Sequence, residues 1–103
     1  MKQVFKLKGK LFQYPRPSIW TRGGWFFIDT GKKLTQEIKK EAEMEPDQFK
    51  YLMAKFKLGK TTWKGKLHPR SAKGNFWIVV SGEIRKKEDI DHGDTVKVEF
   101  TLT

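Results

Sequence analysis

Residues 52–67 read Leu-Met-Ala-Lys-Phe-Lys-Leu-Gly-Lys-Thr-Thr-Trp-Lys-Gly-Lys-Leu. On both sides of Gly59-Lys60 apolar residues alternate with lysines, which is the period of two expected of a half-buried β-strand. The stretch therefore predicts a β-hairpin with a turn near Gly59-Lys60 and one apolar face. Its other face carries four lysines: Lys55, Lys57, Lys64 and Lys66.

Four more strands are predicted outside this hairpin. Residues 3–13 alternate apolar and lysine side chains, and residues 96–102 alternate again at the end of the chain. Residues 25–28 and 76–80 are short apolar runs typical of buried strands. The fold class is therefore mainly β.

Helical signal is limited to one or two short segments. From Leu34 to Met44 apolar residues recur every four positions, with Thr35 as the expected N-cap and Pro46 as the residue that ends the helix. Residues 83–88 have room for a short second helix at most.

Length and composition place limits on the kind of protein. The chain has 103 residues, 14% of them aromatic, so we expect one domain, 1–103, with a core of its own. It contains no cysteine, which excludes disulfides, thiolate metal sites and a cysteine nucleophile, and favours a cytoplasmic location. No stretch approaches the ~18 apolar residues of a membrane span, so no membrane partner is expected.

The net charge of +10 is unevenly distributed along the chain. Residues 49–80 hold eight lysines and arginines and no acid, and residues 1–33 hold eight with one acid. Acidic residues exceed basic ones in the two remaining segments, 34–48 and 81–103.

An internal repeat is suggested by a shift of 51 residues. The shift aligns Phe5-Lys6-Leu7 with Phe56-Lys57-Leu58, and Trp25–Ile28 with Phe76–Val79. The two half-units, about 3–51 and 54–102, are each too small to bury their strands alone, so we expect one shared core. These features predict a β-barrel with an internal pseudo-twofold, built from two strand-strand-helix-strand units. A monomer should suffice, with a weak dimer as the alternative.

Three segments of the second half resemble a family of small bacterial proteins described only as a domain of unknown function (DUF). They are Trp63-Lys-Gly-Lys-Leu-His-Pro69, Gly74-Asn-Phe-Trp-Ile-Val-Val80, and Arg85-Lys-Lys-Glu-Asp-Ile-Asp-His-Gly-Asp-Thr-Val96. The first half agrees more loosely. The resemblance implies a double-split β-barrel, the fold of regulators of the AbrB, MazE and MraZ type.

In those regulators a half-barrel ends in an arginine, a turn and a Gly-Asp-x-Val strand. The matching positions are Arg85, Ile90, Gly93, Asp94 and Val96. The chain departs from the family at Asp29-Thr30, where many relatives have a proline, and at Ser81-Gly82, where a lysine is usual. The second departure weakens any transfer of a binding role, and the family implies no activity.

The residues that could support catalysis do not form a recognisable set. His68 and His92 lie in predicted loops and do not form a known pair. Asp89, Asp91 and Asp94 lack the order of a calcium loop, and Thr30-Gly-Lys-Lys lacks the glycines of a phosphate-binding loop. We therefore predict no catalytic residues, no metal, no cofactor and no enzyme activity.

The tryptophans have two interpretations. Trp25, Trp63 and Trp77 lie in strand patterns with aromatic neighbours, so they are expected to fill the core. Trp20 lies instead in a segment where Tyr14, Arg16 and Arg22 add aromatic and cationic groups. We expect this loop to fold over its own barrel, with a stacking surface for nucleic acid as the alternative.

The basic hairpin is the strongest functional signal. Lysines across a strand pair repel one another unless they are solvated or meet an anion, and they commonly protect an edge strand from aggregation. Protection of an edge is favoured over an anion site. We predict a non-catalytic binding module of unknown partner. One alternative is weak, sequence-tolerant binding of nucleic acid or another polyanion; a second is a small-ligand or enzymatic accessory domain. The candidate nucleic-acid-binding residues are Lys55, Lys57, Lys60, Lys64, Lys66, Arg70 and Lys73.

Overall fold

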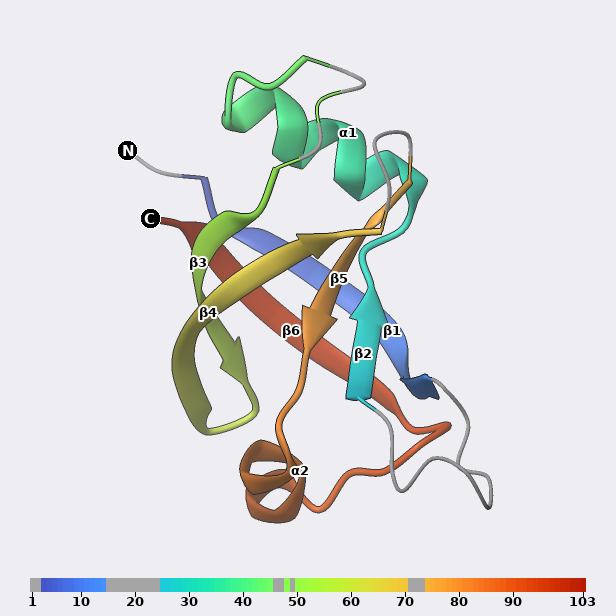
Figure 1. Ribbon diagram of the computed structural model, residues 1–103. Helices are drawn as coiled ribbons and strands as arrows, with labels where there is room; N and C mark the ends of the chain where they lie inside the picture. The colour runs from blue at the N-terminus through green and yellow to red at the C-terminus, as the bar shows by residue number, and fades with distance from the viewer. Residues whose placement is uncertain (1–2, 15–24, 46–47, 49, 71–73) are drawn as a thin grey trace.

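The described residues form a closed antiparallel barrel of six strands with two short helices (Figure 1). The computed structural model describes residues 3–14, 25–45, 48, 50–70 and 74–103. Its elements are β1 (Phe5–Tyr14), β2 (Trp25–Asp29), α1 (Lys32–Glu41), β3 (Leu52–Leu58), β4 (Thr61–Pro69), β5 (Phe76–Val79), α2 (Gly82–Glu88) and β6 (Thr95–Leu102). The order around the barrel is β1-β2-β5-β4-β3-β6. The mainly β class and the hairpin at Gly59-Lys60 are confirmed.

The core is made by alternate residues of every strand. Ile28 of β2 lies opposite Ile78 of β5, and Phe56 of β3 lies opposite Phe100 of β6. All four side chains are buried, and the Phe56 and Phe100 ring centroids are 5.6 Å apart. These two pairs lie where β2 meets β5 and where β3 meets β6, at two of the strand contacts that make up the closed barrel.

Helix α1 begins one turn earlier than the sequence predicts. Gly31, with φ of 82°, precedes it, and no side chain caps its N-terminus. The expected cap, Thr35, is instead buried in the second turn, where its Oγ1 accepts from the Phe76 backbone N–H (3.3 Å). Thr30 Oγ1 donates to the Phe76 carbonyl (3.1 Å), so the Thr35 hydroxyl donates to Thr30 Oγ1 (2.8 Å). Two threonines thus fix α1 to β5.

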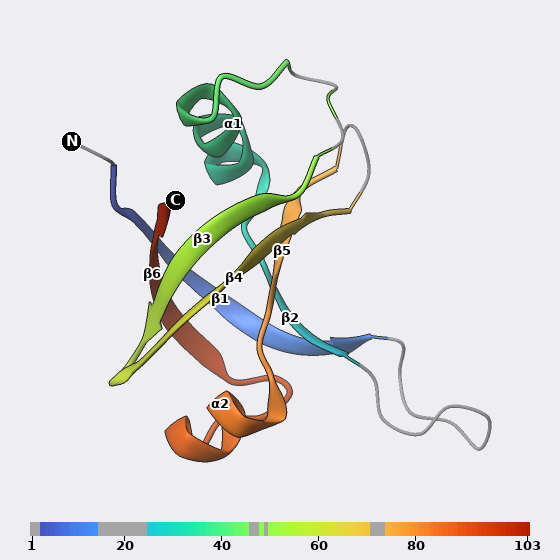
Figure 2. The same cartoon turned by 60° about the vertical axis from the view of Figure 1, so that its left-hand side comes forward.

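Helix α2 lies at the opposite end of the barrel from α1 (Figure 2). Ser81 Oγ accepts from the Ile84 backbone N–H (3.4 Å) and caps the helix. Ile84 is buried, and the Arg85 guanidinium lies 3.5 Å from the centre of the Phe26 ring. In the described ranges of the chain, no helix has the length and apolar character needed to cross a membrane.

The barrel opens along parts of two strands. Strand β4 pairs with β5 only through Leu67–Pro69, and β1 pairs with β2 only through Leu11–Tyr14. The first part of β4 and the N-terminal end of α2 line one cleft, and the first part of β1 and the N-terminal end of α1 line another. Each helix therefore begins beside an opening in the sheet.

The 51-residue alignment is wrong in register. It equates Trp25, which is 62% exposed, with Phe76, which is 0% exposed, although equivalent residues must face the same way. Hydrogen bonds from Thr30 N to Phe76 O and from Val80 N to Phe26 O match at a shift of 50 residues instead. Because side chains alternate along a strand, a slip of one residue exchanges the inner and outer faces.

The expectation that Trp25 and Trp77 fill the core is also wrong. Their neighbours Phe26, Ile28 and Ile78 point inward, so both indoles lie on the outer face of the barrel. The expectation holds in part for Trp63, which is half-buried and packs against the core. Its ring stacks on Phe56, with ring centroids 5.2 Å apart.

We predict losses of stability of very different size for two substitutions that the 51-residue alignment treats as equivalent. Phe76→Ala should lower the free energy of unfolding by about 3–5 kcal/mol, because it removes a fully buried ring. Trp25→Ala should lower it by less than about 1 kcal/mol, because most of its surface is already exposed. Urea denaturation followed by circular dichroism measures both. Equal losses would contradict the register described here.

Candidate functional site

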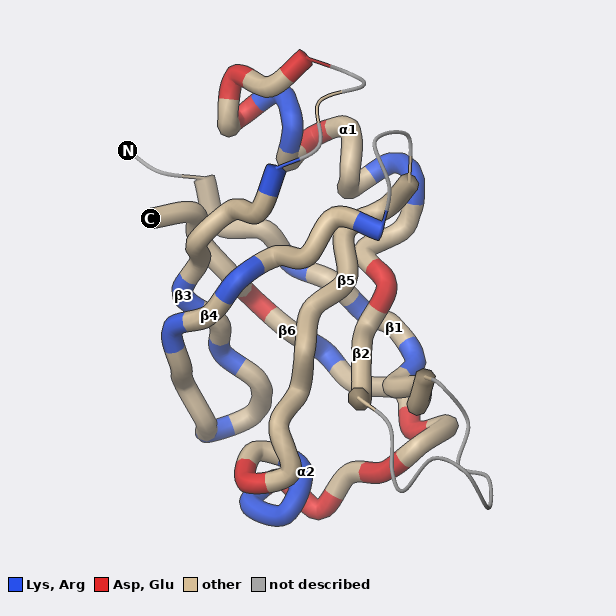
Figure 3. The backbone as a smooth tube through the Cα atoms, in the orientation of Figure 1, with Lys and Arg blue, Asp and Glu red and all other residues tan. Residues whose placement is uncertain are grey.

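Lysines cover the outer face of four neighbouring strands. Strand β6 lies between β1 and β3, and β3 pairs with β4, so the outer faces of β1, β6, β3 and β4 adjoin in that order. Lys55 lies directly opposite Lys64, and Lys8 lies directly opposite Lys97. Figure 3 shows these charges along the β3–β4 hairpin, β1 and β6. We call this surface the lysine face; its members, all exposed, are Lys6, Lys8, Lys10, Lys55, Lys57, Lys64, Lys66 and Lys97.

A single acidic residue lies among these lysines on the four strands. Glu99 of β6 is opposite Lys6 on one side and Lys57 on the other. Among the described residues, Glu99 forms an ion pair with neither of these lysines. The ion pair seen in the described part of the chain lies elsewhere, within α2, and joins Lys87 to Glu83 (3.3 Å). The lysine face is therefore strongly positive, and its charges are compensated by solvent and counter-ions.

The predicted binding residues do not all meet on this face. Lys55, Lys57, Lys64 and Lys66 do, and Lys60 lies in the adjoining turn. Arg70 lies at the end of β4 over two aromatic rings, and Lys73 is outside the described residues. The sequence prediction missed Lys97, whose parity in β6 matches that of the outward Glu99.

A second surface is formed by aromatic rings on the outer face of β1, β2 and β5. Trp77 is at its centre, with ring centroids 4.5 Å from Phe27, 5.0 Å from Phe12 and 5.8 Å from Tyr14. Trp25 stacks nearly parallel to Phe27, at 6.5 Å and 11°. We call Phe12, Tyr14, Trp25, Phe27 and Trp77 the aromatic face. Of the expected stacking segment, Tyr14 belongs to it; Arg16, Trp20 and Arg22 are outside the described residues.

Polar contacts hold the aromatic face in place. The Arg70 guanidinium carbon lies 4.7 Å from the centre of the Trp77 ring and 5.5 Å from that of Tyr14. The Trp77 indole N–H donates to Asp29 Oδ2 (3.2 Å). Asp29 Oδ1 accepts from the Gly31 backbone N–H (2.8 Å) and the Asn75 side-chain amide (3.0 Å). Asp29 therefore fixes the Trp77 indole. It also accepts the hydrogen bond of the Gly31 N–H, which a phosphate-binding loop at this position would need for its ligand.

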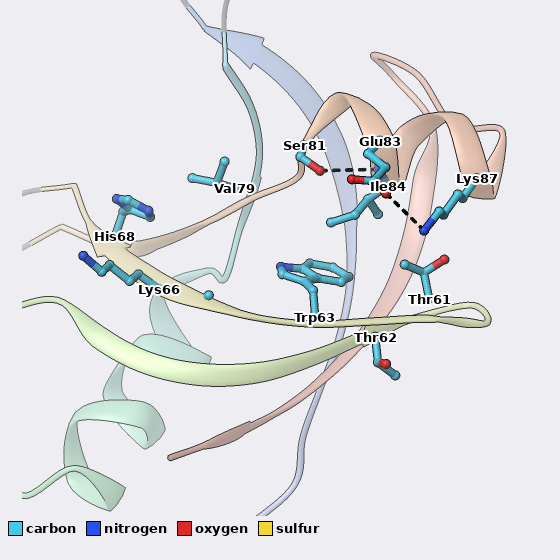
Figure 4. A pocket seen from close by; sticks show the side chains of 11 residues that line it. Thr61, Thr62, Trp63, Lys66, His68, Val79, Ser81, Glu83, Ile84 and Lys87 are labelled. Atoms are coloured by element: carbon cyan, nitrogen blue, oxygen red, sulfur yellow. Dashed lines mark hydrogen bonds and ion pairs between the residues drawn. The ribbon is translucent and has the colours of Figure 1, made fainter.

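A cleft of about 390 Å³ lies where β4 separates from β5 (Figure 4). Trp63 forms its floor, Ser81 and Glu83 at the N-terminal end of α2 lie on one side, and Lys66 and His68 lie toward the other end. Burial, followed by the positive charge of Lys66, lowers the pKa of His68 below its usual 6.5. His68 also packs edge-on against Tyr51, with ring centroids 5.1 Å apart.

The comparison with protein families finds a match that covers most of the barrel. A family described as "Domain of unknown function (DUF1905)" matches residues 8–100, from the first half of β1 to near the end of β6. The chain belongs to this family. No curated protein matches it significantly.

In this DUF1905 chain, the positions singled out by the resemblance stabilise the barrel. Arg85 covers Phe26, and Ile90 packs against the core. Gly93 N donates to the Leu11 carbonyl (2.8 Å), and Leu11 N donates to the Asp94 carbonyl (2.9 Å), so the turn extends the pairing of β6 with β1.

The second histidine belongs to the same turn. His92 Nδ1 accepts from the Gln13 backbone N–H (3.1 Å), which extends the contact between the turn and β1 by one more hydrogen bond. In the described part of the chain, no group of three or more His, Cys, Asp or Glu side chains is arranged to hold a metal ion. His92 is therefore part of the barrel framework.

We predict that the pKa of His68 depends on Lys66. The folded chain binds this proton less readily than the unfolded chain, so the free energy of unfolding should fall as pH drops below 6.5 and level off below the folded pKa. Lys66→Gln should raise the pKa of His68 only part of the way to 6.5, because burial remains. NMR titration of the imidazole protons measures it. Lys60→Gln is the control and should leave the pKa unchanged; an equal rise in both variants would contradict a local effect of Lys66.

Proposed function

We propose that this chain is a non-catalytic, monomeric binding module for nucleic acid. The observation that carries the proposal is the lysine face, where eight exposed lysines on four adjoining strands accompany one acid. Opposed lysines such as Lys55 and Lys64 are a cost to the fold, and a row of phosphates removes that cost. Each neutralised phosphate also releases counter-ions, which favours binding at low salt.

The barrel supports a proposal of internal duplication, with two strand-strand-helix-strand units of the double-split type. Exchanging β1 with β4, β2 with β5 and β3 with β6 leaves the order around the barrel unchanged. In this exchange Leu11 corresponds to Leu67, so Lys8 and Lys10 of β1 correspond to Lys64 and Lys66 of β4. The lysine face would then be two related rows that flank β6 and β3. The proposed relationship to AbrB-type DNA-binding regulators rests on similarity of fold alone.

Edge protection, which the sequence favoured, accounts for only part of the arrangement. Strands β3, β4, β1 and β6 are each paired on both sides for at least part of their length, because the barrel is closed. Lys64 and Lys66 lie in the part of β4 that does not pair with β5, and Lys8 and Lys10 lie in the part of β1 that does not pair with β2. Lys55 and Lys57 of β3 are different, because they pair with β4 on one side and β6 on the other. An anion partner explains Lys55 and Lys57, which border no open edge, better than protection of an edge does.

The non-catalytic part of the proposal rests on the histidines. His92 uses Nδ1 to accept from the Gln13 backbone N–H. His68 lies beside Tyr51 and Lys66, and among the described residues no hydrogen bond joins it to a carboxylate. Within the part of the chain that the structure describes, neither imidazole is hydrogen-bonded to a carboxylate that would orient it as a general base.

The partner should be bound with little sequence preference. Lysine ammonium groups are point charges on flexible stems, and they contact phosphates without reading base edges. We therefore expect dissociation constants in the micromolar range or weaker at physiological salt.

Salt dependence and a matched pair of variants test the proposal. If about five lysines contact phosphates, raising salt from about 50 to 200 mM should weaken binding about 100-fold for a single strand and about 500-fold for a duplex. Lys55/Lys57/Lys64→Gln should weaken binding at the lower salt by about tenfold or more and reduce the salt slope by about 2–3. Fluorescence anisotropy of labelled 12-nucleotide probes measures both quantities.

The control variant is Lys40/Lys86/Lys87→Gln, which removes the same number of charges from exposed positions on the two helices, outside the four strands that carry the lysine face. It should change affinity by less than about threefold. No binding at the lower salt, or equal effects of the two triple variants, would refute nucleic-acid binding through the lysine face.

A further inference from the structure

The aromatic face is more exposed than the packing of a barrel requires. Trp25 is 62% exposed and Tyr14 is 49% exposed, although each has ring contacts on one side. Inside the barrel, Phe26 and Ile28 of the same strand already supply the buried surface. Exposed rings that adjoin one another in this way mark an interaction surface.

The rings also contact one another and polar neighbours. Trp77 is fixed by its hydrogen bond to Asp29 and by the Arg70 guanidinium over its face. Arg70 reaches Tyr14 as well, and Phe27 lies between Trp77 and Trp25. A ligand that stacks here meets planes that are already positioned, so little conformational entropy is lost on binding.

Two strands connect the aromatic face to the lysine face. Along the outer side of β1, Lys8 and Lys10 are followed by Phe12 and Tyr14. Along the outer side of β4, Lys64 and Lys66 are followed by His68, which lies opposite Trp77 of β5. Alternate residues on a strand are about 6.6 Å apart, so cationic and aromatic groups follow each other closely on both strands.

We infer that the ligand of this module is single-stranded nucleic acid, with unpaired bases stacking on Trp25 and Tyr14 while phosphates lie along the lysine face. This inference rests on the nucleic-acid function proposed above. Stacking on aromatic side chains requires a free base face and tolerates any sequence. A duplex has its bases stacked on one another and offers only its backbone, so the aromatic face would contribute nothing to duplex binding.

The test compares three probes of equal length: single-stranded dT 12-mer, a 12-base-pair duplex, and a 12-mer of abasic sites with the same backbone. At about 50 mM salt the unmodified protein should bind the dT probe at least tenfold more tightly than the abasic probe. Trp25→Ala and Tyr14→Ala should each weaken dT binding by about 5- to 140-fold, which is the range for one stacked base. Binding of the duplex and abasic probes should change by less than twofold.

Two further variants separate stacking from general apolar contact. Trp25→Phe keeps an aromatic plane and should retain most of the affinity for dT, whereas Trp25→Leu keeps apolar area and should behave like Trp25→Ala. Circular dichroism checks that each variant is folded. Equal affinity for dT and abasic probes, or retained affinity in Trp25→Leu, would overturn the inference.

The remaining outcomes distinguish this inference from the proposed function. Salt-dependent binding of all three probes with equal affinity would refute the single-strand preference and leave the lysine face as a general polyanion site. Absence of binding to every probe would refute both. Concentration-dependent dimerisation by sedimentation, lost in Trp25→Ala and unaffected by dT, would show that a second copy of the chain covers these rings and would also overturn the inference.

Discussion

The pairing of Ile28 with Ile78, where β2 meets β5, fixes the direction of every outer side chain on that half of the barrel. Both isoleucines are fully buried. Because side chains alternate along a strand, Phe27, Asp29 and Trp77 must then point outward. The pair Phe56 and Phe100 has the same role between β3 and β6, and places the neighbouring lysines outside. The two outer surfaces therefore follow from which residues fill the core.

The sequence predicts this arrangement well where polar and apolar residues alternate. In residues 52–67 and 96–102 the charged side chains mark the outer face directly, so the hairpin and the last strand were predicted with the correct faces. In residues 25–28 and 76–80 nearly every side chain is apolar, and no pattern indicates which of them point inward. The aromatic face could not be predicted for this reason. It becomes visible only when the pairing across the barrel is known.

The internal similarity was misplaced for a related reason. By their positions in the barrel, Leu11 corresponds to Leu67, Ile28 to Ile78 and Phe56 to Phe100, so the shift changes from one pair of strands to the next. The connections between corresponding elements differ in length, and one constant shift cannot accommodate them. Matches such as Phe5-Lys6-Leu7 with Phe56-Lys57-Leu58 arise because every lysine-covered strand has the same alternation. Lys97 was overlooked because its segment also contains the turn acids Asp89, Asp91 and Asp94.

Repulsion within the opposed pairs Lys55–Lys64 and Lys8–Lys97 makes the stability of the fold depend on ionic strength. Dissolved salt screens such repulsion over about 8 Å at physiological strength, so added salt strengthens the barrel while it weakens any attraction to a distant polyanion. Added salt therefore raises the stability of the fold and lowers the affinity for a polyanion. At low ionic strength the strands on this side are under the greatest electrostatic strain, and a bound chain of phosphates relieves it. If the proposed polyanion binds there, it would also stabilise the folded state and raise the melting temperature in dilute buffer.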